Sequence, residues 1–108
     1  MIQVIDGKRY NTETAESIHE HSNGHFVGDF RFRTKDLMRT KLGAWFLHHV
    51  GGAMSDMSVN VGNNGRGGSE DIEPVSDDDA YGFLESHSDY EGARAAIDKY
   101  FAERVQDA

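Results

Sequence analysis

The pattern of apolar and polar positions is most informative between residues 37 and 50, LMRTKLGAWFLHHV. Residues 41–43 (KLG) predict a tight turn, because glycine takes a positive φ without steric cost. Residues 45–47 (WFL) follow directly, so the second arm of this hairpin is apolar on both faces. A strand of that kind belongs in the interior of a sheet. We therefore expect the core to form around this hairpin.

Short strands are also predicted before this hairpin. Asp6-Gly7 favours a type I′ turn between strands at residues 2–5 and 8–11. Residues 12–22 fit both a helical stripe and an exposed strand of period two, and we favour the strand, with Asn23-Gly24 as the turn that ends it.

Residues 29–35 alternate cleanly between two kinds of side chain. One face would carry Phe30, Phe32 and Thr34, and the other would carry Arg31, Arg33 and Lys35. This pattern predicts a half-buried strand with a basic outer face. Sequential strands usually pair, so residues 1–50 predict an antiparallel β meander of about five to six short strands.

The composition changes after Val50. Residues 51–69 are rich in Gly and Asn and poor in large apolar side chains, which predicts a long surface loop and a candidate binding surface. A disordered connector is the alternative. Residues 70–75 predict one more short strand, in which Pro74 is tolerated at an edge or a strand end.

Two amphipathic helices are expected over residues 76–106. Ser76, with Asp79 three residues later, predicts the start of the first helix, and Ser88 with Glu91 repeats this arrangement for the second. The expected fold class is α+β, a single domain over residues 1–108 in which both C-terminal helices pack on one face of the meander. Their buried faces would contain Ala80, Phe83 and Leu84 in the first helix and Tyr90, Ala93, Ile97, Tyr100, Phe101 and Val105 in the second.

The formal net charge of −8 is concentrated towards the C-terminus, where residues 69–108 hold 12 acidic and 3 basic side chains. Such a surface repels nucleic acid and attracts basic protein surfaces. The simplest function of acidic side chains is solubility. Clustered in space, they would instead imitate a nucleic-acid backbone and occupy a basic groove of a partner protein. The candidate partner-binding residues are Glu70, Asp71, Glu73, Asp77, Asp78, Asp79 and Glu85.

A basic surface offers the opposite function, direct nucleic-acid binding. Its candidate residues surround two phenylalanines on the predicted strand, a combination that suits phosphates and stacked bases. The overall negative charge weakens this alternative through long-range repulsion. The residues are Arg31, Arg33, Lys35 and Arg39.

Catalytic and metal signatures are weak. His19, His21 and His25 lie close together, and His48 and His49 would point to opposite faces of a strand, but their spacing matches no metal-binding motif. Residues 62–69 (GNNGRGGS) have glycine where a phosphate-binding loop needs lysine, and no GxSxG sequence is present. We expect neither an enzyme nor a cofactor nor a bound metal; a metal-dependent enzyme using the histidines is the third hypothesis.

The chain has no cysteine, no apolar run near the roughly 20 residues of a membrane span, and no signal-peptide pattern at residues 1–10. We therefore expect a protein of the host-cell cytoplasm that does not contact the membrane. The sequence leaves the choice between monomer and dimer open.

Several short strings along residues 1–85 resemble a family of small uncharacterised proteins carried by phages, plasmids and other bacterial mobile elements. They are residues 8–15 (KRYNTETA), 22–24 (SNG), 29–30 (DF), 39–47 (RTKLGAWFL), 51–55 (GGAMS), 62–64 (GNN) and 72–74 (IEP). The resemblance implies a context and assigns no chemistry to a residue. Small acidic proteins of mobile elements include inhibitors of host defence, among them anti-CRISPR proteins. The alanine-rich second helix departs from the family pattern.

Combined with the acidic C-terminal region, this resemblance makes inhibition of a host defence system the leading hypothesis. The protein would bind a basic, nucleic-acid-binding surface of an effector protein, with a CRISPR effector subunit as a candidate partner, and would act without turnover.

Overall fold

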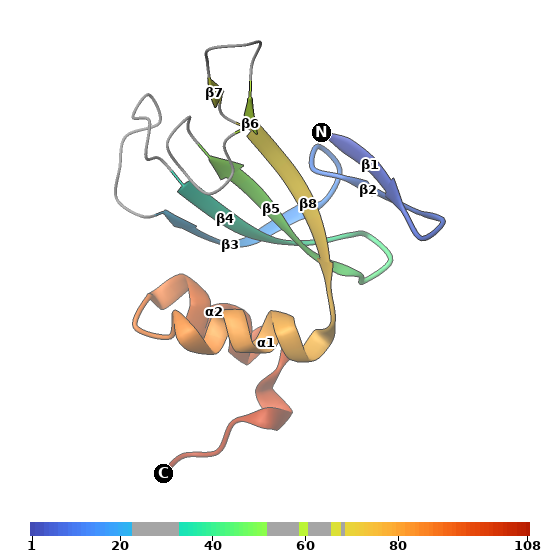
Figure 1. The fold of residues 1–108 in the computed structure, drawn as a ribbon. Coiled ribbons are helices and arrows are strands. Elements are labelled where there is room, and N and C mark those ends of the chain that lie inside the picture. Colours follow the sequence, from blue (N-terminus) through green and yellow to red (C-terminus); the bar gives the residue numbers. More distant parts are fainter. Residues whose placement is uncertain (23–32, 52–58, 61–65, 68) are drawn as a thin grey trace.

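The computed structural model describes residues 1–22, 33–51, 59–60, 66–67 and 69–108. Its elements follow the chain from an N-terminal hairpin through a sheet to two helices (Figure 1). In order they are β1 (Ile2–Ile5), β2 (Lys8–Asn11), β3 (Glu16–Ser22), β4 (Arg33–Arg39), β5 (Trp45–Gly51), β6 (Val59–Asn60), β7 (Arg66–Gly67), β8 (Ser69–Val75), α1 (Asp77–Ser86), α2 (Glu91–Tyr100) and a 3₁₀ turn, η1 (Ala102–Arg104).

The central sheet has four antiparallel strands in the order β3-β4-β5-β8. The predicted hairpin forms its middle, with β5 paired to β4 on one side and to β8 on the other. Gly43, at φ +92°, donates its N–H to the Thr40 carbonyl in the turn. Trp45 is 5% exposed and Phe46 is fully buried, so the prediction of an interior strand is confirmed.

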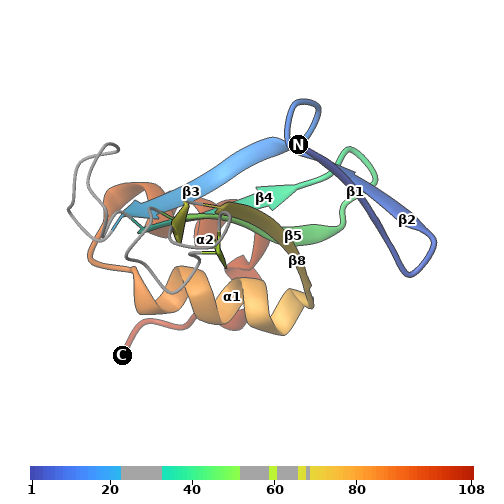
Figure 2. The ribbon, with the colours of Figure 1, turned by 45° about the horizontal axis from the view of Figure 1, so that its top comes forward.

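Both helices cover one face of this sheet, and the β1–β2 hairpin lies on the other side (Figures 1 and 2). On the helix-facing side Leu37 and Trp45 pack against apolar residues of α1 and α2, among them Leu84 and Ile97. The opposite face carries a second core cluster of Tyr10, Met38, Phe46 and Ile72. The α+β class, with a meander and two C-terminal helices, is confirmed.

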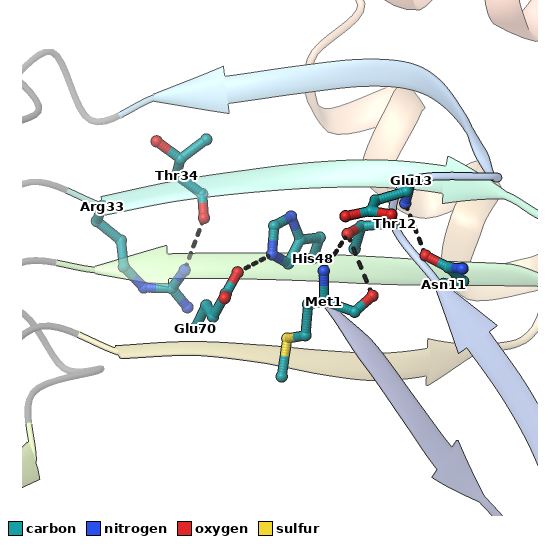
Figure 3. A network of polar contacts seen from close by, with 8 residues as sticks. All are labelled: Met1, Asn11, Thr12, Glu13, Arg33, Thr34, His48 and Glu70. Carbon is teal, nitrogen blue, oxygen red and sulfur yellow. Dashed lines mark hydrogen bonds and ion pairs between the residues drawn. The ribbon is translucent and has the colours of Figure 1, made fainter.

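The N-terminal hairpin turns where the sequence predicts. Asp6 and Gly7 both have positive φ, +51° and +77°, as a type I′ turn requires. The hairpin is tied to the start of the next segment, because the Met1 ammonium donates to Thr12 Oγ1 at 2.9 Å (Figure 3). The Thr12 N–H also donates to the Met1 carbonyl at 3.0 Å. Residues 16–22 form β3, in agreement with the strand interpretation of that segment.

The strand expected at residues 29–35 differs from the structure in its limits and its orientation. The chain forms one strand, β4, over Arg33–Arg39, and residues 29–32 and the Asn23-Gly24 turn lie outside the described residues. Thr34 is buried as expected. Lys35, however, shares its side of the sheet with Leu37, which packs beneath the helices. The basic face expected on the outside is therefore the helix-facing one.

The glycine-rich segment is not wholly irregular. Within residues 51–69 the two-residue strands β6 and β7 pair with each other, and β8 starts at Ser69 rather than at residue 70. Backbone pairing needs no large side chain, which explains why composition concealed it. The rest of the predicted loop, residues 52–58, 61–65 and 68, lies outside the described residues. Pro74 occupies β8, at the edge of the sheet, as predicted.

The first helix begins as predicted and the second does not. Ser76 caps α1, whereas Tyr90 rather than Ser88 is the N-cap residue of α2 and makes no side-chain capping bond. The second helix also ends earlier than expected, at Tyr100, because Phe101 leaves helical geometry at φ −133° and stacks on Trp45 with ring centroids 5.4 Å apart. Val105, placed on the buried face by its spacing, is 45% exposed.

Among the described residues, no helix has the length and apolar character needed to cross a membrane.

Candidate functional site

Six carboxylates line the free edge of the sheet and the start of the first helix. Three lie on β8, the last strand of the sheet. Among the described residues only β5 pairs with it, so its other edge is free. Three more form the first turn of α1, which follows β8 after a single residue (Figure 1). All six are exposed. We call this set the acidic ridge: Glu70, Asp71, Glu73, Asp77, Asp78 and Asp79.

The length of the acidic ridge follows from strand geometry. Asp77 is seven positions after Glu70, which corresponds to about 23 Å along an extended chain. Glu85, the seventh predicted partner-binding residue, lies about 10 Å further along the axis of α1 than Asp78. The predicted acidic residues thus follow one edge of the sheet into α1 and do not form a compact cluster. Glu70 and Glu73 lie on opposite faces of the sheet, because they contact His48 and His49 respectively.

The helix start explains why three aspartates are tolerated side by side. Ser76 Oγ accepts a hydrogen bond from the Asp79 N–H at 3.1 Å. The remaining N–H groups of the first turn give that end of the helix a partial positive charge, which stabilises Asp77, Asp78 and Asp79. These three carboxylates are therefore held on a rigid element.

Two histidines of β5 fix carboxylates on β8, one on each face of the sheet. His48 Nε2 lies 2.7 Å from Glu70 Oε2 (Figure 3), and His49 Nε2 lies 2.8 Å from Glu73 Oε1. The prediction that His48 and His49 point to opposite faces agrees with their separate partners. Both contacts restrain the ridge where it follows the strand.

Further along the ridge the contacts are few. Arg104 donates to Asp78 Oδ1 at 2.6 Å, but that carboxylate side chain remains 82% exposed. Among the described residues, Asp71, Asp77 and Asp79 have no side-chain hydrogen bond or ion pair. Negative charge on the ridge is therefore only partly compensated from within the protein.

Glu85 has a local role on α1. It accepts a hydrogen bond from the Tyr81 hydroxyl at 2.7 Å, and this bond raises the pKa of Tyr81, because the neutral phenol is the donor. Arg104 lies over the same Tyr81 ring. The carboxylate is consequently part of a side-chain network on the helix surface.

The predicted basic residues are not presented together. Arg39 stacks against Trp45 and Tyr100, with its guanidinium carbon 5.5 and 5.0 Å from the ring centroids. Arg33 donates to the Thr34 carbonyl and contacts His49 Nδ1 at 2.8 Å. Of the candidates, Lys35 is exposed, and Arg31 lies outside the described residues. Aromatic and histidine neighbours thus engage two of these cations.

Three histidines meet on the helix-facing side of the sheet. His19 and His21 share one side of β3, as predicted, and His87, which ends α1, lies with its ring centroid 5.6 Å from His19 and 4.2 Å from His21. His87 is the member that sequence reasoning missed, because only the packing of α1 on the sheet brings it there. His25 lies outside the described residues.

Two members of this histidine cluster, His19 and His21, favour the uncharged imidazole. Burial lowers the pKa of His19 and of His21, and the neighbouring charge of His87 lowers each pKa further. His19 Nε2 is buried and has no hydrogen-bond partner. Adding protons to the cluster therefore requires either a loss of stability or a nearby anion.

Metal binding by the histidines would require a group of suitable ligands among the described residues. Among them, no group of three or more His, Asp or Glu side chains is arranged to hold a metal ion.

Comparisons with protein-family models, curated proteins and solved structures found no match to this chain. The resemblance to mobile-element proteins stays a prediction.

Proposed function

We propose that the protein is a non-catalytic inhibitor that docks its acidic ridge onto a basic, nucleic-acid-binding surface of a partner protein. The acidic ridge supports this proposal: six exposed carboxylates follow a free strand edge into a helix start. The resemblance to mobile-element proteins favours a host-defence effector, such as a CRISPR effector subunit, as the partner.

Electrostatics gives the ridge its mode of action. A basic groove that evolved to hold phosphates accepts a row of carboxylates through the same Coulomb attraction, and blocks nucleic acid by occupying the same place. A net charge of −8 also speeds the approach of a basic partner. Strand and helix positions limit the conformational entropy lost when the ridge binds.

The ridge is tested by removing three of its charges together. In Asp77→Asn/Asp78→Asn/Asp79→Asn the Asp79 N–H still donates to Ser76, so the helix cap remains. Wild-type protein should capture a purified effector and release it as the salt concentration rises, and the triple variant should bind at least tenfold more weakly. Affinity is measured by surface plasmon resonance and folding by circular dichroism.

A charge-matched control separates the ridge from net charge. Asp6→Asn/Glu13→Gln/Glu20→Gln removes three exposed carboxylates from the N-terminal hairpin, the following turn and β3, away from the ridge. This control should keep most of its affinity for the effector. Undiminished binding of the effector by the folded ridge variant would contradict the proposal. Direct binding of nucleic acid by the wild-type protein would favour the nucleic-acid alternative.

A further inference from the structure

A cleft of about 410 Å³ opens between the helix-facing side of the sheet and the last turn of α1. Its volume lies within the range of small-molecule sites, about 300–1,000 Å³. Among the described residues that line it there is no carboxylate, in a protein with a net charge of −8. We call it the histidine cleft: His21, Arg33, Lys35, Phe83, Ser86 and His87.

Positive charge in the histidine cleft comes first from β4. Arg33 and Lys35 are two residues apart, so both side chains lie on the helix-facing side of the strand. Arginine nitrogen can only donate, so the Arg33 contact makes His49 Nδ1 an acceptor and leaves Nε2–H to donate to Glu73. This chain of hydrogen bonds fixes the orientation of the guanidinium.

The histidines of the cleft add positive charge only when they are protonated. His87 Nδ1 lies 2.8 Å from the Phe83 carbonyl, which can only accept, so this nitrogen carries a hydrogen. Protonation therefore adds a second donor at His87 Nε2. His21 stacks on that ring at 4.2 Å, and a ligand's negative charge would compensate the proton that burial and repulsion otherwise disfavour.

We propose that the histidine cleft binds the phosphate group of a small ligand through Lys35, Arg33 and the imidazoles of His21 and His87. Phosphate accepts several charge-assisted hydrogen bonds, which matches a site made of donors. The Phe83 ring also lines the cleft and offers an aromatic surface for a nucleobase, so a nucleoside monophosphate satisfies both features. This site is separate from the acidic ridge.

Binding is tested by calorimetry with inorganic phosphate, AMP and adenosine at pH 7.5. We expect saturable binding of phosphate and of AMP, competition between them, and no binding of adenosine. A higher affinity for AMP would identify the phosphate ester as the ligand, and equal affinities would identify free phosphate. The proposal would be overturned if neither phosphate nor AMP saturated the protein at concentrations up to about 10 mM. It would also be overturned if adenosine and AMP bound equally well.

The Lys35→Gln variant locates the ligand. Lys35 is exposed, so the substitution should leave the fold intact, and losing one charge-assisted hydrogen bond should weaken phosphate and AMP binding about tenfold. Lys41→Gln, at the exposed turn between β4 and β5, removes the same charge elsewhere and should bind like wild type. Equal affinities of the Lys35→Gln and wild-type proteins would rule out the histidine cleft.

Proton coupling is tested with sulfate, which remains a dianion between pH 7.5 and 6.0. Sulfate should bind wild type more tightly at the lower pH, because the anion favours protonated His21. The charges of Lys35, His87 and Asp89 also act on this ring, and the charge of Asp36, on the other face of β4, acts on the neighbouring His19. His21→Gln should reduce the pH dependence; an unchanged dependence would exclude His21 from the site.

Discussion

At the residue scale, one hydroxyl distinguishes the two serines that precede the helices. Ser76 Oγ accepts the Asp79 N–H, whereas Ser88 lies within the turn that leads into α2. Ser76→Ala should lower the free energy of unfolding by about 1 kcal/mol, because a helix N–H loses its acceptor. Chemical denaturation followed by circular dichroism measures the difference.

Ser88→Ala is the matched control for this cap. Its side chain is exposed and caps no helix, so its unfolding free energy should stay within about 0.5 kcal/mol of wild type. Equal losses in the two variants would contradict the assignment of Ser76 as the N-cap.

Sequence patterns could not separate these two serines. Each is followed three residues later by an acidic residue, which is the pattern of a capping box. In the structure the Tyr90 N–H donates to the His87 carbonyl, so a turn intervenes and α2 begins at Glu91. A helix start depends on the path of the preceding chain, which local sequence does not determine.

At the element scale, the same substitution at two glycines should have opposite effects. Gly82, inside α1, has open space where a Cβ would lie, so Gly82→Ala should raise the unfolding free energy by about 0.5–1 kcal/mol through its higher helix propensity. Gly43→Ala should lower it, because φ is +92° and the new Cβ would lie 3.1 Å from Arg39 Nη2. Thermal denaturation of both variants gives the signs, and stabilisation by both would contradict the hairpin geometry.

Elements with a strong local signal were predicted well. The Asp6-Gly7 turn, the interior strand at residues 45–47 and the start of α1 follow from glycine conformation, apolar density and a capping residue. Period-two alternation correctly placed Thr34 and Lys35 on opposite sides of the strand, but it does not predict which side the helices will cover. That choice depends on tertiary packing, and it places Lys35 beside the helices.

At the scale of the whole molecule, the candidate sites differ in how much the sequence reveals. The acidic ridge is visible in advance because its carboxylates are close together in the chain, on β8 and the first turn of α1. The histidine cleft combines β3, β4 and the end of α1, so its residues meet only after the helices pack on the sheet. His87 carries no sequence signal of its own.

Packing of the histidines also predicts how the stability of the whole protein depends on pH. At pH 7.5 the ordinary imidazole is neutral in both folded and unfolded chains. As the pH falls through 6.5, the ordinary pKa of histidine, the unfolded chain takes up protons first, because the folded-state pKa values of His19 and His21 are lowered. The unfolding free energy should therefore decrease between pH 7.5 and pH 5.5.

Asp36 contributes with the opposite sign. Burial raises its pKa in the folded state, so the folded protein takes up this proton before the unfolded chain does, and acidification through that pKa favours folding. The net slope of stability with pH thus contains both groups, and a variant is needed to isolate the histidines.

His21→Gln provides that separation. It removes one titrating ring and the repulsion that this ring exerts on His19, while Asp36 remains in place. The variant should lose less unfolding free energy than wild type between pH 7.5 and pH 5.5 in urea denaturation, because fewer imidazoles resist protonation in the folded state. If His21→Gln and wild type lost the same free energy over this interval, the cluster would not control the acid sensitivity of the fold.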